Sequence, residues 1–208
     1  MRLPRRLCGA AGRSGASCIA VNPFHALFPQ WPANASPYSP SSRQFLNPIY
    51  IDVAAAPFAV EALDLAALEP KLGPLRGARL VDYTAVWRTK RAALENLFRI
   101  FQDRRTTSEI GGAFARFVVD GGELLAQFGA FSALQEEHGT DWQAHRGRYP
   151  GPEAPALQQF ARENPERVAF HIYLQFLAER QLETAAQAAR GGGMEIGIVR
   201  DLAVGVSP

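Results

Sequence analysis

The chain has 208 residues, of which 47% are hydrophobic and 20% charged, and its formal net charge is +2. This composition is close to that of an ordinary globular domain and argues against extensive disorder. The small charge, without a basic stripe, gives no reason to expect a nucleic-acid partner. No apolar run approaches the ~18 residues that a membrane-spanning helix needs.

Residues 1–16 are basic, rich in small side chains and free of acids. This composition is compatible with an organellar targeting peptide. The alternative, which we favour, is a poorly ordered or truncated helix, because the letters GAAGRSGAS read as the tail of a helix followed by a glycine turn. Cys8 and Cys18 form no zinc or CxxC pattern, which suits a reduced, cytoplasmic protein.

A short apolar run, Cys18–Val21, predicts a buried strand, and Asn22-Pro23 leads out of it into a long loop. In this loop Tyr38 is flanked by Ser36-Pro37 and Ser39-Pro40. Each proline fixes its own φ near −65° and favours extended geometry in the preceding residue. The loop therefore holds an aromatic ring and several hydroxyls at the end of a strand, an arrangement suited to binding a sugar.

The middle of the chain is predicted to be helical, after an extended segment from Phe45 to Val53. Prolines at 57, 70 and 74 leave room for at most one short helix between Ala54 and Leu80, around Ala59–Leu68. A helix is predicted from an Asp82 N-cap to Arg104, and a second is capped by Thr107 or Ser108, interrupted at Gly121-Gly122 and continued to His138-Gly139. A loop over Trp142–Pro155 and a short helix over Pro155–Arg162 follow. The last elements are a long helix from Pro165 to Ala189 and a strand over Met194–Val199.

Aromatic residues recur on these helices at three- and four-residue steps, which indicates core packing rather than a ligand groove, and we place Trp87 and Trp142 in that class. Glu136 and Glu137 are expected on an exposed helix face, where adjacent side chains point apart and cannot flank one bond. The histidines at 138, 145 and 171 share no metal-ligand spacing. No metal or cofactor is expected.

Five blocks together resemble the amylomaltase (4-alpha-glucanotransferase, disproportionating enzyme) family in its bacterial form. They are NPFHALFP, ASPYSPSSR, FLNPIYIDV, FHIYLQFLAERQL and GMEIGIVRDLAVGV, in this order from Asn22 to Val206. The resemblance implies an α/β fold: a partial (β/α)8 (TIM) barrel with a large, mostly helical insertion. Such a barrel typically needs ~250 residues.

The resemblance also implies a division of the chain into four segments. Residues 1–16 would be a poorly ordered or truncated barrel helix, and 17–53 a barrel strand with its substrate loop. Residues 54–163 would be the helical insertion, and 164–208 a long helix, a barrel strand and its strand-end loop.

In the family pattern, the aspartate of the strand-end motif contacts the sugar beside the scissile bond, and here it is Asp201. The tyrosine that lies over the glucan corresponds to Tyr38, and Ser36 would hydrogen-bond the same sugars. Asn22 and His25 could line the cleft. The alternatives are a turn cap for Asp201, a loop anchor for Tyr38 and a structural role for His25.

The resemblance implies transfer of α-1,4-glucan segments between malto-oligosaccharides by retaining double displacement. A retaining enzyme uses two carboxylates ~5–5.5 Å apart. In the family, the nucleophile and the acid/base residue lie downstream of the last matching block, so we expect no catalytic residue in this chain and no activity from it alone. The alternative function is a non-catalytic helical module that binds glucans or a partner. The oligomeric state is not predicted.

Overall fold

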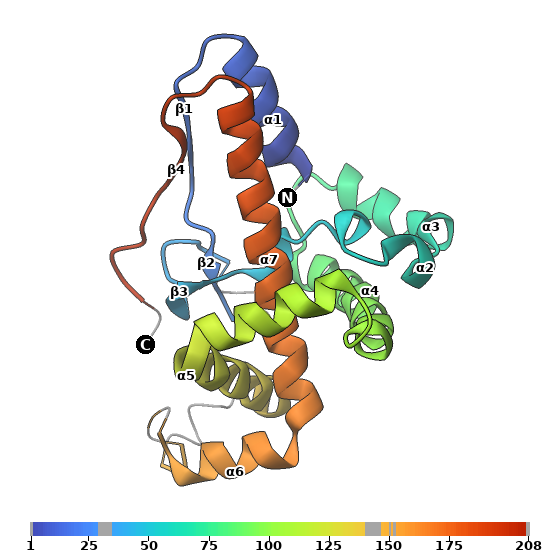
Figure 1. The fold of residues 1–208 in the computed structure, drawn as a ribbon, viewed down its shortest axis with the longest axis vertical. Helices are drawn as coiled ribbons and strands as arrows, with labels where there is room; N and C mark the ends of the chain where they lie inside the picture. The colour runs from blue at the N-terminus through green and yellow to red at the C-terminus, as the bar shows by residue number, and fades with distance from the viewer. Residues whose placement is uncertain (1, 29–34, 140–146, 150, 152, 207–208) are drawn as a thin grey trace. The chain divides into compact units, whose positions relative to one another are not determined.

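The computed structural model describes residues 2–28, 35–139, 147–149, 151 and 153–206. The chain divides into two compact units, and Figure 1 shows the course of the chain through both. The first unit comprises Met1–Ala56 and Leu177–Pro208, and the second comprises Pro57–Phe176. Among the described residues, no helix combines the length and the apolar character that crossing a membrane requires.

The first unit contains short strands beside helices. Its elements are α1 (Arg2–Arg13), β1 (Cys18–Val21), β2 (His25–Ala26), β3 (Ser42–Leu46), the 3-10 turns η2 (Pro48–Tyr50) and η3 (Val53–Ala55), the last part of α7 (Pro165–Gly191), and β4 (Gly197–Arg200). Strands β1 and β4 pair in parallel, with Cys18 opposite Gly197 and Val21 opposite Arg200. Strands β2 and β3 are antiparallel, with an irregularity between His25 and Ala26.

Small residues allow α1 to lie close to the end of α7. A Cβ added at Gly12 would stand 2.5 Å from the carbonyl oxygen of Gly192, so only glycine fits this contact. Cys8, Ala189 and Met194 are buried together beside it. Gly15 follows α1 with φ +88°, so the favoured prediction of a helix tail and a glycine turn is confirmed.

The two 3-10 turns are fixed by side chains that replace missing backbone partners. The Asn47 carboxamide oxygen accepts from the Ile49 N–H at 3.0 Å, and an Asp52 carboxylate oxygen accepts from the Ala54 N–H at 3.2 Å. The Gln181 side chain accepts from the Asp52 N–H at 2.8 Å and donates to its carbonyl at 2.9 Å. These bonds attach the segment between β3 and the second unit to α7.

The second unit is helical. Its elements are α2 (Ala59–Ala62), α3 (Leu65–Gly77), α4 (Tyr83–Arg104), α5 (Glu109–His138), α6 (Pro155–Glu163) and the first part of α7. The predicted N-caps are confirmed, since Asp82 accepts from the Ala85 N–H at 2.9 Å and Ser108 from the Gly111 N–H at 3.2 Å. The predicted interruption of α5 is a kink at Gly122, where φ is 52° and ψ is −146°.

The aromatic side chains of these helices form the core of the second unit, as predicted. The Phe101 ring stacks on Tyr173 with centroids 4.7 Å apart, and Phe114 meets Phe101 edge-on at 5.1 Å. Trp87 is also buried, whereas Trp142 lies outside the described residues. A second cluster joins α5 to α6 through Leu134, Leu157 and Phe160, among others.

Two predictions about helices and prolines were wrong. The region between Ala54 and Leu80 holds two helices instead of one, and α3 runs through both Pro70 and Pro74. Each proline removes one backbone donor. Most of the α3 side chains are exposed, so water can satisfy the carbonyls that lose their partners.

Several strand predictions also need correction. Cys18–Val21 is a strand, but its residues are exposed or half-buried because its sheet has two strands in the described residues. The C-terminal strand begins at Gly197 instead of Met194, since Met194 is buried in the cluster with Cys8, and Gly197 has φ +88°. The segment Phe45–Val53 is extended only at its start and then forms the 3-10 turns, and β2 and β3 were not anticipated.

Candidate functional site

The parallel pairing of β1 and β4 brings two polar side chains to the same edge of the sheet. Asn22 follows β1 directly and Asp201 follows β4. The Asp201 N–H donates to the Val21 carbonyl at 3.0 Å, so the backbone pairing continues one residue past the strand. The carboxyl end of a parallel strand is where α/β folds present functional side chains.

Tyr38 reaches this edge from a tight turn. The Ser39 N–H donates to the Ser36 carbonyl at 3.2 Å, which closes a turn with Pro37 and Tyr38 at its centre. The Ser36 hydroxyl oxygen accepts from the Tyr38 N–H at 3.3 Å. Proline at the second position of the turn and the serine hydroxyl therefore set the direction in which the Tyr38 side chain leaves the loop.

The Tyr38 hydroxyl donates to Asp201 Oδ2 at 3.0 Å and lies 3.5 Å from Asn22 Oδ1. The bond to Asp201 raises the pKa of Tyr38 above its ordinary value, because ionisation would place a phenolate beside a carboxylate. About half of the Tyr38 side chain is exposed, at 49%. Its ring thus has a fixed position and remains accessible to a ligand.

The segment that carries Asp201 is held by further bonds. Asp201 Oδ1 accepts from the Leu202 N–H at 2.8 Å. His25 Nε2 accepts from the Ala203 N–H at 3.3 Å, and Arg43 Nη1 donates to the Val204 carbonyl at 3.2 Å. Burial, together with the charges of Arg200 and Arg43, lowers the pKa of His25 below 6.5.

The structure brings all five predicted site residues into one connected group. Ser36 and Asn22 contact Tyr38, and Tyr38 contacts Asp201. His25 binds Ala203, two residues after Asp201. Arg43 was missed as a member of this group. It ends the ASPYSPSSR block, and that position was the available signal. The group offers an aromatic face, a carboxylate and a carboxamide to solvent, which is the chemistry that recognises a polyhydroxylated ligand.

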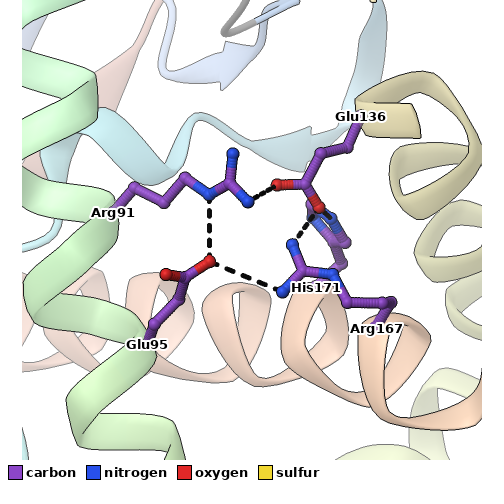
Figure 2. A network of polar contacts seen from close by, with 5 residues as sticks. All are labelled: Arg91, Glu95, Glu136, Arg167 and His171. Atoms are coloured by element: carbon purple, nitrogen blue, oxygen red, sulfur yellow. Dashed lines mark hydrogen bonds and ion pairs between the residues drawn. The ribbon is translucent and has the colours of Figure 1, made fainter. Parts of the chain in front are cut away.

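The described residues contain no group of three or more His, Cys, Asp or Glu side chains that could hold a metal ion. A polar cluster does occur in the second unit, where α4, α5 and α7 meet (Figure 2). Glu136 forms an ion pair with Arg91 through one carboxylate oxygen and with Arg167 through the other. His171 Nε2 lies 3.2 Å from the second oxygen.

Glu95 completes this cluster by pairing with Arg91 at 3.0 Å and Arg167 at 3.5 Å. Burial acts to raise the pKa of Glu136, but hydrogen bonds from His171 and Arg167 and the charges of His171 and Arg91 lower it to about 2. The prediction that Glu136 lies on an exposed face was therefore wrong, since its side chain is 10% exposed; Glu137 is exposed, as predicted. We refer to Arg91, Glu95, Glu136, Arg167 and His171 as the Glu136 cluster.

Comparisons with known proteins identify relatives along almost the whole chain. The family model described as 4-alpha-glucanotransferase matches residues 4–208. The 4-alpha-glucanotransferase of Mycobacterium tuberculosis strain H37Rv is 35% identical over 216 residues, which cover 96% of this chain and 28% of the relative. The Haemophilus influenzae enzyme of the same name is 30% identical over 214 residues, with coverages of 95% and 31%.

Solved structures of amylomaltases resemble this chain over nearly its whole length. The amylomaltase from Corynebacterium glutamicum superposes with a TM-score of 0.71 at 27% identity, over 98% of this chain and 27% of that chain. The Streptococcus agalactiae amylomaltase in complex with acarbose gives 0.68 at 19% identity and supports the fold alone, with coverages of 98% and 39%. The chain spans about 28% of the length of the mycobacterial relative. With its α/β fold and its match from residue 4 to residue 208, the chain belongs to the 4-alpha-glucanotransferase family.

Proposed function

We propose that this chain supplies part of the donor cleft of a 4-alpha-glucanotransferase, an enzyme that transfers α-1,4-glucan segments between malto-oligosaccharides. The observation that carries the proposal is the 3.0 Å bond between Tyr38 and Asp201, which joins the substrate loop to the end of β4. The relatives named 4-alpha-glucanotransferase support this activity. A cytoplasmic location belongs to the same proposal.

In this proposal β1 and β4 are two strands of a (β/α)8 barrel, and residues 54–163 are the helical insertion. Their parallel register supports this assignment, because neighbouring barrel strands run parallel. The free edges of this two-stranded pair would then face further strands of the complete barrel. Segment 17–53 contributes the loop of Tyr38, and segment 164–208 contributes Asp201.

Each predicted site residue has a distinct role. The exposed Tyr38 ring would stack on a pyranose face, and Asp201 would accept hydrogen bonds from sugar hydroxyls with its remaining lone pairs. Asn22 adds a carboxamide beside them. Ser36 both supports Tyr38 and keeps a hydroxyl proton to donate. That His25 lines the cleft stays a prediction.

In the full enzyme the reaction is a retaining double displacement. A carboxylate nucleophile forms a covalent glycosyl-enzyme, and the 4-hydroxyl of a second glucan resolves it, with a general acid/base acting in both steps. Asp201 supplies a single carboxylate to the group around Tyr38. We therefore expect this chain to bind malto-oligosaccharides without rearranging them.

The experiment is a titration of the 208-residue chain with maltoheptaose, in which the amide resonances of Tyr38, Ser39 and residues 198–204 report binding. Replacing Tyr38 by alanine should weaken binding by roughly tenfold, if a pyranose stacks as strongly on an aromatic ring as a nucleic-acid base does, which contributes about 1–3 kcal/mol. The matched control is Tyr83→Ala, because Tyr83 is a partly exposed tyrosine on α4 of the other unit.

Equal affinities for the two variants and the wild type would refute the site. Incubation with maltotriose tests the second claim. Formation of glucose and longer chains by the pure chain would overturn the expectation that it is inactive alone. The alternative of a glucan-binding helical module is less favoured, because the aromatic side chains of α4, α5 and α7 are packed in the core.

A further inference from the structure

His25 joins two segments that are far apart in the sequence. Its Nε2, on β2, accepts from the Ala203 N–H after β4 at 3.3 Å. An imidazole that accepts through Nε2 is neutral and carries its proton on Nδ1.

The segment held in this way has Ala203 as its anchor. Ala203 is fully buried, whereas its neighbours Leu202 and Val204 are 62% and 92% exposed. Arg43 binds the same segment through the Val204 carbonyl. The position of Asp201 thus depends on β4 on one side and on the Ala203 anchor on the other.

We propose that His25 is a positioning residue, whose neutral ring fixes the segment Asp201–Val204, and that protonation of this ring releases the segment and weakens glucan binding. His25 then acts through Asp201 without touching the sugar. The part of the proposal that concerns glucan rests on the proposed function, whereas the attachment of the segment stands on the hydrogen bonds alone.

The surroundings of His25 favour its neutral ring, and the geometry of its bond to Ala203 explains why protonation would break the attachment. Burial disfavours a charged ring, and the charges of Arg200 at the end of β4 and Arg43 in β3 act in the same direction. The charge of Asp201 and the Arg43 backbone act in the opposite direction but do not outweigh them. A protonated Nε2 would also carry a hydrogen toward the Ala203 N–H, placing two donors face to face.

The first test uses the wild-type chain labelled with ¹⁵N. The Ala203 amide resonance and the His25 ring nitrogens should change together as the pH falls below 6.5, and maltoheptaose affinity should fall roughly three- to tenfold over the same range, as expected for the loss of one hydrogen bond. If Ala203 does not respond when His25 titrates, the proposal is overturned without reference to any variant.

Two variants sharpen the test. His25→Gln can keep an acceptor near Nε2 but cannot titrate, so it should retain binding and lose the pH step, whereas His25→Leu should bind weakly at every pH. His138→Gln, on α5 of the other unit, is the matched control and should keep the wild-type step. A pH step in His25→Gln equal to that of the wild type would refute the positioning role. Absence of maltoheptaose binding at any pH would refute the proposed function, and the Ala203 response would still decide the attachment.

Discussion

Replacing Glu136 by glutamine removes the charge at the centre of the Glu136 cluster while keeping the size of the side chain. Its carboxylate pairs with Arg91 and Arg167 and contacts His171 at 3.2 Å. The variant leaves two guanidinium groups close together without the carboxylate between them. Removing one partner of a buried ion pair is costly because the remaining charge stays desolvated.

The magnitude follows from the pKa of Glu136, which is about 2 against an ordinary value of 4.5. This difference corresponds to roughly 3 kcal/mol of folding free energy. Arg91 and Arg167 are 34% and 38% exposed, so water screens part of the interaction. We therefore expect Glu136→Gln to lower the free energy of unfolding at pH 7 by about 2 kcal/mol.

Urea unfolding monitored by far-ultraviolet circular dichroism measures this change. The matched control is Glu137→Gln, because Glu137 is the next residue on α5, has the same side chain and is exposed. Its effect should stay within about 0.5 kcal/mol. Equal midpoints for the two variants would refute the reasoning.

The pH dependence provides a second check on the same residue. The pKa of Glu136 is lower in the folded than in the unfolded chain, so its contribution is fully present above about pH 4.5 and is lost as the pH falls toward 2. The difference in stability between the wild type and Glu136→Gln should therefore shrink over this range. A constant difference from pH 7 to pH 2 would contradict the assignment.

Two further predictions concern other parts of the chain. Asp201→Asn should return the pKa of Tyr38 toward 10.0, because the bond to the carboxylate is the main cause of its increase. Ultraviolet difference titration against Tyr38→Phe isolates this one phenol, and an unchanged titration would exclude the bond. Gly111→Ala should destabilise the chain by about 2 kcal/mol, since its Cβ would stand 1.6 Å from the Arg105 carbonyl oxygen, whereas the exposed Gly112→Ala should stabilise α5 by roughly 0.5–1 kcal/mol. Urea midpoints that shift in the same direction for both glycines would contradict this contact.

Local sequence signals predicted much of the helical architecture. The N-caps Asp82 and Ser108, the break at Gly122 and the start of α7 at Pro165 depend on chemistry within a few residues. The α/β class and the family came from the ordered blocks. Some of the predictions that failed depended on distant contacts: Met194 leaves the strand pattern because it is buried with Cys8.

The sequence alone determined the family, most helix boundaries and the five candidate residues of the site, because motifs and caps are encoded in short stretches of chain. Only the tertiary structure decided that Tyr38 bonds Asp201, 163 positions away, and that Glu136 turns inward while Glu137 faces solvent. The physical reason is that β1 and β4 come together by backbone pairing, and that the face of a helix is chosen by the elements that pack against it. Neither contact is written in the spacing of neighbouring residues.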